Sequence, residues 1–184
     1  MLVKEGVKLK EKDIPNAEEE LGKKIPVILK NFLLIHNGLA LSFCSYDFYL
    51  DSVKEEVSFE SFLGIHFINS NYDLIKINNK FLNELPSCEE ILIIGRDSGG
   101  NFYLLNYGKE TPGIYYWDRI RSHSYVGDNE LENEQTVLNY EDEGQHIYVV
   151  TENSEMFFKQ FKSFLIENNA EFKTIINYKE IENF

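Results

Sequence analysis

The chain has 184 residues, of which 43% are hydrophobic and 14% aromatic, and this composition argues against a disordered protein. The length fits one domain that buries a sizeable core. The formal net charge is -13, which disfavours direct binding to nucleic acids and to anionic membranes, because both recruit Lys and Arg. The charge favours a basic partner instead, although many soluble proteins are acidic without having one.

The amino-terminal residues give no sign of export. Residues 1–13 are rich in Lys and lack the apolar run that a signal peptide needs. The longest apolar stretch, residues 25–35, is interrupted by Lys30 and Asn31 and is too short to span a bilayer. Cys44 and Cys88 match neither a C-x-x-C pattern nor a zinc-ligand spacing. We therefore expect a cytoplasmic protein whose two cysteines pack as small apolar residues.

Two helices are predicted near the amino terminus. The first covers residues 16–22, with Asn16 as the cap and Gly22 as a left-handed end. Pro26 suits the first turn of the second helix, which ends at Asn37-Gly38. The second helix carries a broad apolar face that is typical of a helix packed on a core.

The middle of the chain alternates between strand and helix patterns. Strand formers are frequent from Leu39 to Leu50, and residues 57–68 are expected to continue as strand. Apolar residues at helical spacing predict a helix over residues 71–84, which Pro86 follows.

A three-stranded antiparallel meander is the strongest local prediction. Residues 91–95 form a wholly apolar run, and residues 97–101 are turn formers. Residues 102–107 alternate between two faces, and a second turn leads into residues 114–117.

The carboxy-terminal third begins with a polar, acidic stretch over residues 122–146. A strand is expected at residues 147–150, and a helix at 155–167 with Ser154 as its cap. The pattern at residues 171–184 fits helix and strand equally. Together the elements predict one α+β domain, an antiparallel β-sheet flanked by helices.

These elements, in this order, resemble the SMI1/KNR4 family, also called the SUKH superfamily. The matching residues are Glu18, Leu21-Gly22, Ile25-Pro26, Phe32-Leu33, Asn37-Gly38, Ile93-Ile94-Gly95, Asp97, Gly100-Asn101, Tyr103, Gly113-Ile114-Tyr115-Tyr116-Trp117, Ser154, Phe157, Phe158 and Phe161. Each motif alone occurs widely, and their shared order makes the resemblance specific. It implies a single SMI1/KNR4-like domain over residues 1–184, with a family-like core at about 14–167.

The resemblance also implies a function. Bacterial members act as immunity proteins that bind and block a toxin domain, often a nuclease, by occluding its active site. Fungal members act in cell-wall and signalling regulation, so a regulatory adaptor that scaffolds cellular proteins is the alternative. An enzyme is the third hypothesis, and it would require a deep pocket with convergent titratable groups.

Most of the matching positions have a structural explanation. Gly22, Gly38 and Gly100 suit tight backbone geometry, and Pro26 suits a helix start. Trp117 is expected in the core. These positions therefore identify the fold without marking a binding site.

The candidate partner-binding residues lie in the acidic stretch, which has no Lys or Arg between Arg121 and Lys159. They are Asp128, Glu130, Glu132, Glu134, Glu141, Asp142 and Glu143. In an extended chain the first four would project to one side, roughly 6.6 Å apart, near the spacing of phosphates along a nucleic-acid strand. One hypothesis is that they occupy the basic substrate groove of a nuclease toxin, and the other is a solvated acidic loop without a partner.

No residue pattern indicates a cofactor, a metal or a catalytic group. A calcium loop starting at Asp128 would need Gly and Glu where Asn133 and Asn139 stand. The four histidines lack the spacing of metal ligands, and Ser98 is not in a nucleophile elbow. Exposed tyrosines, with Tyr46, Tyr125 and Tyr140 as candidates, are expected to anchor a protein interface.

Overall fold

The computed structural model describes residues 1–124 and 146–176. The strands of its large sheet are β1 (Leu2–Glu5), β2 (Leu39–Leu41), β5 (Ser61–Phe62), β6 (Ile91–Arg96), β7 (Phe102–Asn106), β8 (Gly113–Trp117), β9 (Ile147–Thr151) and β10 (Glu171–Thr174). They form an 8-stranded sheet in the order β10-β1-β2-β5-β6-β7-β8-β9. Every neighbouring pair is antiparallel except β1 with β10, which run parallel.

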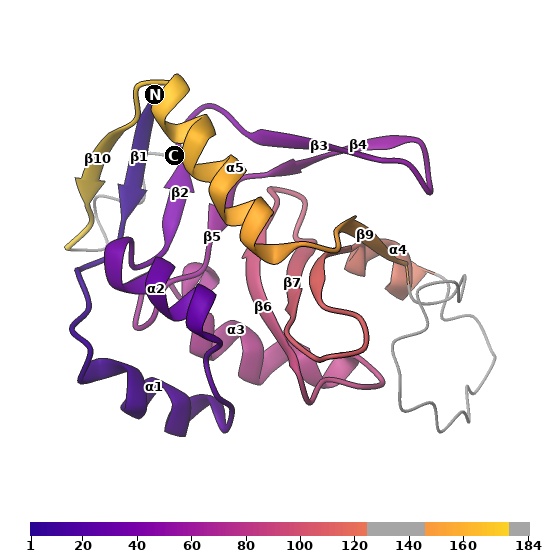
Figure 1. Ribbon diagram of the computed structural model, residues 1–184, viewed down its shortest axis with the longest axis horizontal. Coiled ribbons are helices and arrows are strands. Elements are labelled where there is room, and N and C mark those ends of the chain that lie inside the picture. The colour runs from indigo at the N-terminus through magenta and orange to yellow at the C-terminus, as the bar shows by residue number, and fades with distance from the viewer. Residues whose placement is uncertain (125–145, 177–184) are drawn as a thin grey trace.

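Two further strands, β3 (Tyr46–Leu50) and β4 (Glu55–Phe59), form a separate hairpin. We call this hairpin the arm, because it projects from the body of the molecule (Figure 1). The helices are α1 (Asp13–Leu21), α2 (Val27–Ile35), α3 (Leu74–Phe81), α4 (Arg119–Ser124) and α5 (Ser154–Glu167), with 3-10 turns η1 (Ser70–Tyr72) and η2 (Leu82–Glu84). The predicted α+β architecture, a mainly antiparallel sheet flanked by helices, is confirmed.

Both faces of the central strands are covered, and β7 shows how. Phe102 points to one side, where its ring lies 5.2 Å from Phe81 of α3. Its neighbour Tyr103 points to the other side, where its ring lies 4.8 Å from Phe59 of the arm. This two-sided burial accounts for the apolar composition of the predicted meander, which is confirmed.

Aromatic rings join the arm and α5 to the sheet. Phe161 of α5 lies 5.5 Å from Phe59 of β4 and 4.9 Å from Phe62 of β5, ring centre to ring centre. Phe157, one turn earlier, lies 5.4 Å from Phe48 of β3. Such edge-to-face and offset pairs add to the stability gained from burial. The root of the arm is thus part of the core, and so is Leu50 at the far end of β3, which is buried.

The positions expected to serve the scaffold do so. Gly22, Gly38 and Gly100 have left-handed φ angles of 65°, 74° and 96°, and Trp117 is buried. The buried Asn37 amide donates to the carbonyls of Val7 and Ile65 and accepts from the Ile65 N–H. One side chain thereby joins two loops to the end of α2.

Several boundaries differ from the sequence prediction. The first helix begins at Asp13, not Asn16, because Pro15 is tolerated within a first turn. The last helix is capped by Asn153, whose side chain accepts from the Met156 N–H, so Ser154 is already helical. Strand structure ends at Phe62, well before residue 68.

Three further observations concern the sequence expectations. Residues 171–184, whose pattern fitted helix and strand equally, begin with the strand β10. Cys44 and Cys88 are free thiols that pack partly buried against the core. Within residues 1–124 and 146–176, no helix has the length and apolar character needed to cross a membrane.

Candidate functional site

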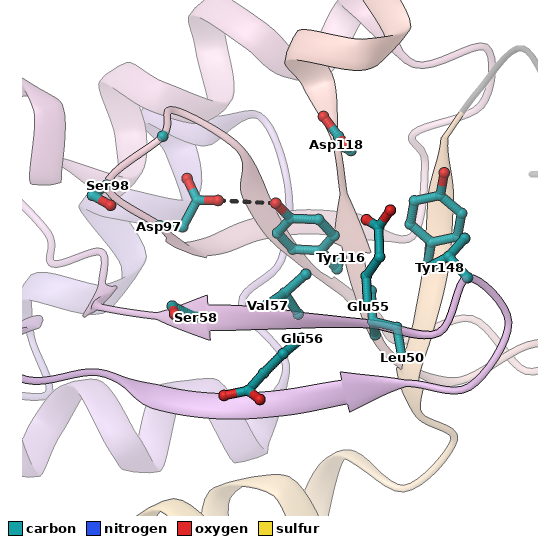
Figure 2. A pocket seen from close by; sticks show the side chains of 12 residues that line it. Leu50, Glu55, Glu56, Val57, Ser58, Asp97, Ser98, Tyr116, Asp118 and Tyr148 are labelled. Atoms are coloured by element: carbon teal, nitrogen blue, oxygen red, sulfur yellow. Dashed lines mark hydrogen bonds between the residues drawn. The ribbon is translucent and has the colours of Figure 1, made fainter.

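A hollow of about 300 Å³ lies between the arm and the end of the meander (Figure 2). The arm contributes one wall, and the β6–β7 turn, the end of β8 and β9 contribute the other. The lining residues are Leu50, Val53, Glu55, Glu56, Val57, Ser58, Asp97, Ser98, Gly99, Tyr116, Asp118 and Tyr148. The hollow therefore combines four carboxylates with two tyrosines.

Asp97 is the carboxylate of the hollow that is held by a hydrogen-bond network with Asn101 and Tyr116. Its Oδ1 accepts from the Asn101 backbone N–H at 2.9 Å, and its Oδ2 accepts from Asn101 Nδ2 at 3.0 Å. The same Oδ2 accepts from the Tyr116 hydroxyl at 2.9 Å, the bond drawn in Figure 2. Burial, followed by the charge of Asp97 and this bond, raises the pKa of Tyr116 above its usual range. Tyr116 therefore stays a neutral donor.

The Asp97–Asn101 turn also positions the helix that follows the meander. Asn101 Oδ1 accepts from the Ile120 N–H at 3.2 Å, in the first turn of α4. Asp118 Oδ1 accepts from the Arg121 N–H at 2.9 Å in the same turn. The side chains of Asn101 and Asp118 thus fix where α4 begins. The sequence pattern did not reveal this role.

Arg121 lies at the border of the hollow and touches its carboxylates. Its Nη2 lies 3.5 Å from Glu55 Oε1, and its Nε lies 3.6 Å from Asp118 Oδ2. The pKa of the Arg121 guanidinium is raised, first by a hydrogen bond with Tyr148 and then by the charges of Glu55 and Asp118. The contacts of Arg121 therefore show that the carboxylates of Glu55 and Asp118 are placed to pair with a guanidinium group.

The arrangement has a clear chemical preference. The carboxylate and hydroxyl oxygens that line the hollow accept hydrogen bonds from ammonium and guanidinium groups. Within the described residues, no group of three or more His, Cys, Asp or Glu is placed to hold a metal ion. The lining of the hollow is thus chemically suited to ammonium and guanidinium groups.

The seven acidic residues proposed from the sequence, Asp128, Glu130, Glu132, Glu134, Glu141, Asp142 and Glu143, lie outside the described residues. The chain enters that stretch from α4 and leaves it into β9. Asp118, next to α4, and Tyr148, on β9, both line the hollow. The acidic stretch is therefore connected at both ends to residues beside the hollow.

The tyrosines are distributed differently from the expectation. Tyr46 is half-buried and packs against Phe164, with ring centres 4.8 Å apart, so its ring belongs to the core. Tyr125 and Tyr140 lie outside the described residues. Tyr49, which the sequence pattern did not single out, is 61% exposed on the arm. Alternating burial along β3 is the signal that separates Tyr49 from Tyr46.

Comparison with known proteins gives one match. The sequence model of the SMI1 / KNR4 family (SUKH-1) matches residues 8–167, which is most of the chain. We found no significant match among curated proteins or among solved structures. The family is known for immunity-type functions and is generally non-catalytic. On this match, and on an α+β fold that agrees with it, the chain belongs to the SMI1/KNR4 family (SUKH-1).

Proposed function

We propose that this protein is an immunity protein that binds a basic toxin domain, of nuclease type, and occludes its active site. The observation that carries the proposal is the hollow, in which the arm and the meander bring together Glu55, Glu56, Asp97 and Asp118. Membership in a family with immunity-type functions supports the same reading. The protein itself performs no reaction in this proposal.

Electrostatics supports a basic partner at this site. The whole chain carries a formal charge of -13, so a basic protein is attracted before any contact forms. A Lys or Arg of the toxin then enters the hollow and competes with Arg121 for Glu55 and Asp118. Since Arg121 is partly exposed, it swings aside at low energetic cost.

In this proposal, occlusion rests on the acidic groups of the chain. Nuclease active sites bind phosphates through basic residues, so an acidic surface fits the same groove that the substrate uses. The hollow and the connected acidic stretch, residues 128–143, supply that surface in this proposal. The toxin is inhibited because its substrate and the immunity protein compete for one groove.

Co-expression with the protein encoded beside its gene is the test of the proposal. We expect the chain to restore growth to cells that express the toxic neighbour, and to co-purify with it as a stable complex. A neighbour that is not toxic, or a toxic neighbour that the chain neither binds nor neutralises, contradicts the immunity role and returns the regulatory adaptor to consideration.

The hollow itself is tested by a charge-matched pair of variants. Glu55→Gln with Glu56→Gln removes two charges from the hollow and should weaken the complex at low salt by roughly tenfold, through slower association. Glu11→Gln with Glu19→Gln removes two charges from exposed positions at and just before α1, on the other side of the molecule (Figure 1). If both pairs reduce association equally, net charge and not the hollow guides the partner.

A further inference from the structure

Phe43 combines two unfavourable features in the loop between β2 and the arm. Its side chain is 97% exposed, and its backbone has a left-handed φ of 60°. A residue with a Cβ rarely adopts this conformation, and bulky residues are outliers there. A Gly or Asn would relieve the backbone, and a polar residue would suit the exposure.

The backbone on both sides of Phe43 is held in place. The Ser42 N–H donates to the Leu2 carbonyl at 3.1 Å, and Tyr46 packs into the aromatic core. Cys44, the next residue, is partly buried against the core. Phe43 is therefore a fixed projection, and Leu2, whose carbonyl accepts the Ser42 N–H, is itself 39% exposed.

An acidic face runs from this loop along the outer side of the arm. Asp47 pairs with Ser58 and Tyr49 with Glu56, and directly paired residues project to the same side of a hairpin.

This outer face of the arm is continuous with the hollow. Glu56 and Ser58 belong to the outer face, and both also line the hollow. Phe43 lies at the root of the arm, and β3 spans about 13 Å from there towards the tip. The arm therefore presents an aromatic group at one end and the acidic hollow at the other.

We infer that Phe43 is the apolar anchor of the toxin interface, and that it inserts into an apolar recess flanked by basic residues on the toxin. Aromatic residues dominate the binding energy of protein interfaces, and surrounding charges set rate and specificity. The carboxylates of Asp47 and Glu56 on the outer face of the arm select a recess with a basic rim. This inference rests on the proposed immunity function and adds the anchor that charge alone does not provide.

The test uses Phe43→Gly in the full chain, with the toxin that the wild-type chain neutralises as the probe. Because Gly adopts the left-handed conformation without strain, the substitution should raise the Tm of the free protein by a few degrees. The affinity for the toxin should fall roughly 30-fold or more, because the aromatic ring is lost. His66→Gly is the matched control, because His66 is also exposed and left-handed, with φ of 52°. It should raise the Tm similarly and leave the affinity unchanged. Phe43→Tyr keeps the ring and should restore most of the binding.

The outcomes separate the anchor from the proposed function. A Phe43→Gly variant that is as stable as the wild type, or more so, and binds the toxin with unchanged affinity overturns the anchor and leaves the immunity role intact. A loss of binding by the His66→Gly control as well overturns the anchor, because the effect would not be specific to the ring. A wild-type chain that neutralises no toxin overturns the proposed function, and the anchor with it.

Discussion

Replacing Asn37 by Ala tests whether a single buried amide holds the amino-terminal half of the fold together. The side chain makes hydrogen bonds of 2.9 Å to the Val7 carbonyl, 2.9 Å to the Ile65 carbonyl and 2.7 Å from the Ile65 N–H. Alanine keeps the backbone bond from the Gly6 N–H to the Asn37 carbonyl, so only the amide is removed.

The magnitude follows from which partners can reach water. Val7 is exposed, so its carbonyl recovers a bond to solvent, whereas Ile65 is fully buried and both of its backbone groups lose their partner. Each unsatisfied buried group costs about 1–3 kcal/mol, which gives a total loss of about 2–6 kcal/mol. For a chain of this size, the Tm should fall on the order of 10 °C.

Urea and thermal unfolding followed by circular dichroism measure this loss. Asn79→Ala is the control, because Asn79 donates one bond to the Glu20 carbonyl in an exposed setting. Its loss should be under about 1 kcal/mol. If Asn37→Ala costs no more than this control, the amide does not link the two loops in the way described, and the reasoning fails.

Three further predictions follow. Gly38→Ala should destabilise the fold strongly, because a Cβ would lie 2.7 Å from the Gly64 nitrogen. Gly22→Ala, with open space around it, should cost only about 1 kcal/mol. Similar urea midpoints for the two variants would contradict this. Burial raises the pKa of Tyr103 and, together with Asp97, that of Tyr116, so the folded state keeps protons that the unfolded state loses. Stability should therefore fall above about pH 10 by up to about 1.4 kcal/mol per pH unit for each tyrosine, and a flat profile of urea midpoints between pH 9 and 11 would refute it. Changing Asp128, Glu130, Glu132 and Glu134 together to Asn and Gln should slow association with the toxin and weaken its salt dependence in stopped-flow measurements, whereas unchanged kinetics would remove these residues from the interface.

Local patterns predicted much of the fold. The meander was recognisable because three apolar strands follow one another with turn residues between them. The end of the first helix was recognisable because Gly22 adopts the left-handed conformation that a helix end requires, whereas the second helix ends at Ile35 with an extended His36, before the predicted Gly38. These features depend only on neighbours in the sequence.

Features that depend on distant parts of the chain were not predicted. The strand β1 has only four residues, too few for a clear alternation, and it is stabilised by β2 and β10 on its two sides. The hollow is formed by the arm, a turn and β9, which are far apart in the sequence. Glu55 and Glu56 therefore have the sequence pattern of ordinary surface charges, and only the folded arrangement makes them part of the lining that also contains Asp97.

The parallel pair of β1 and β10 has a consequence for the order of folding. The Met1 amine donates to the Asn168 carbonyl across 167 residues of sequence, and β10 pairs with β1 immediately after that contact. During synthesis one edge of β1 stays open until β10 has left the ribosome. Contacts between such distant segments form slowly, because the intervening loop must close first. The β1–β10 seam should therefore form last and open first, and its amide hydrogens should exchange with solvent faster than those of the meander.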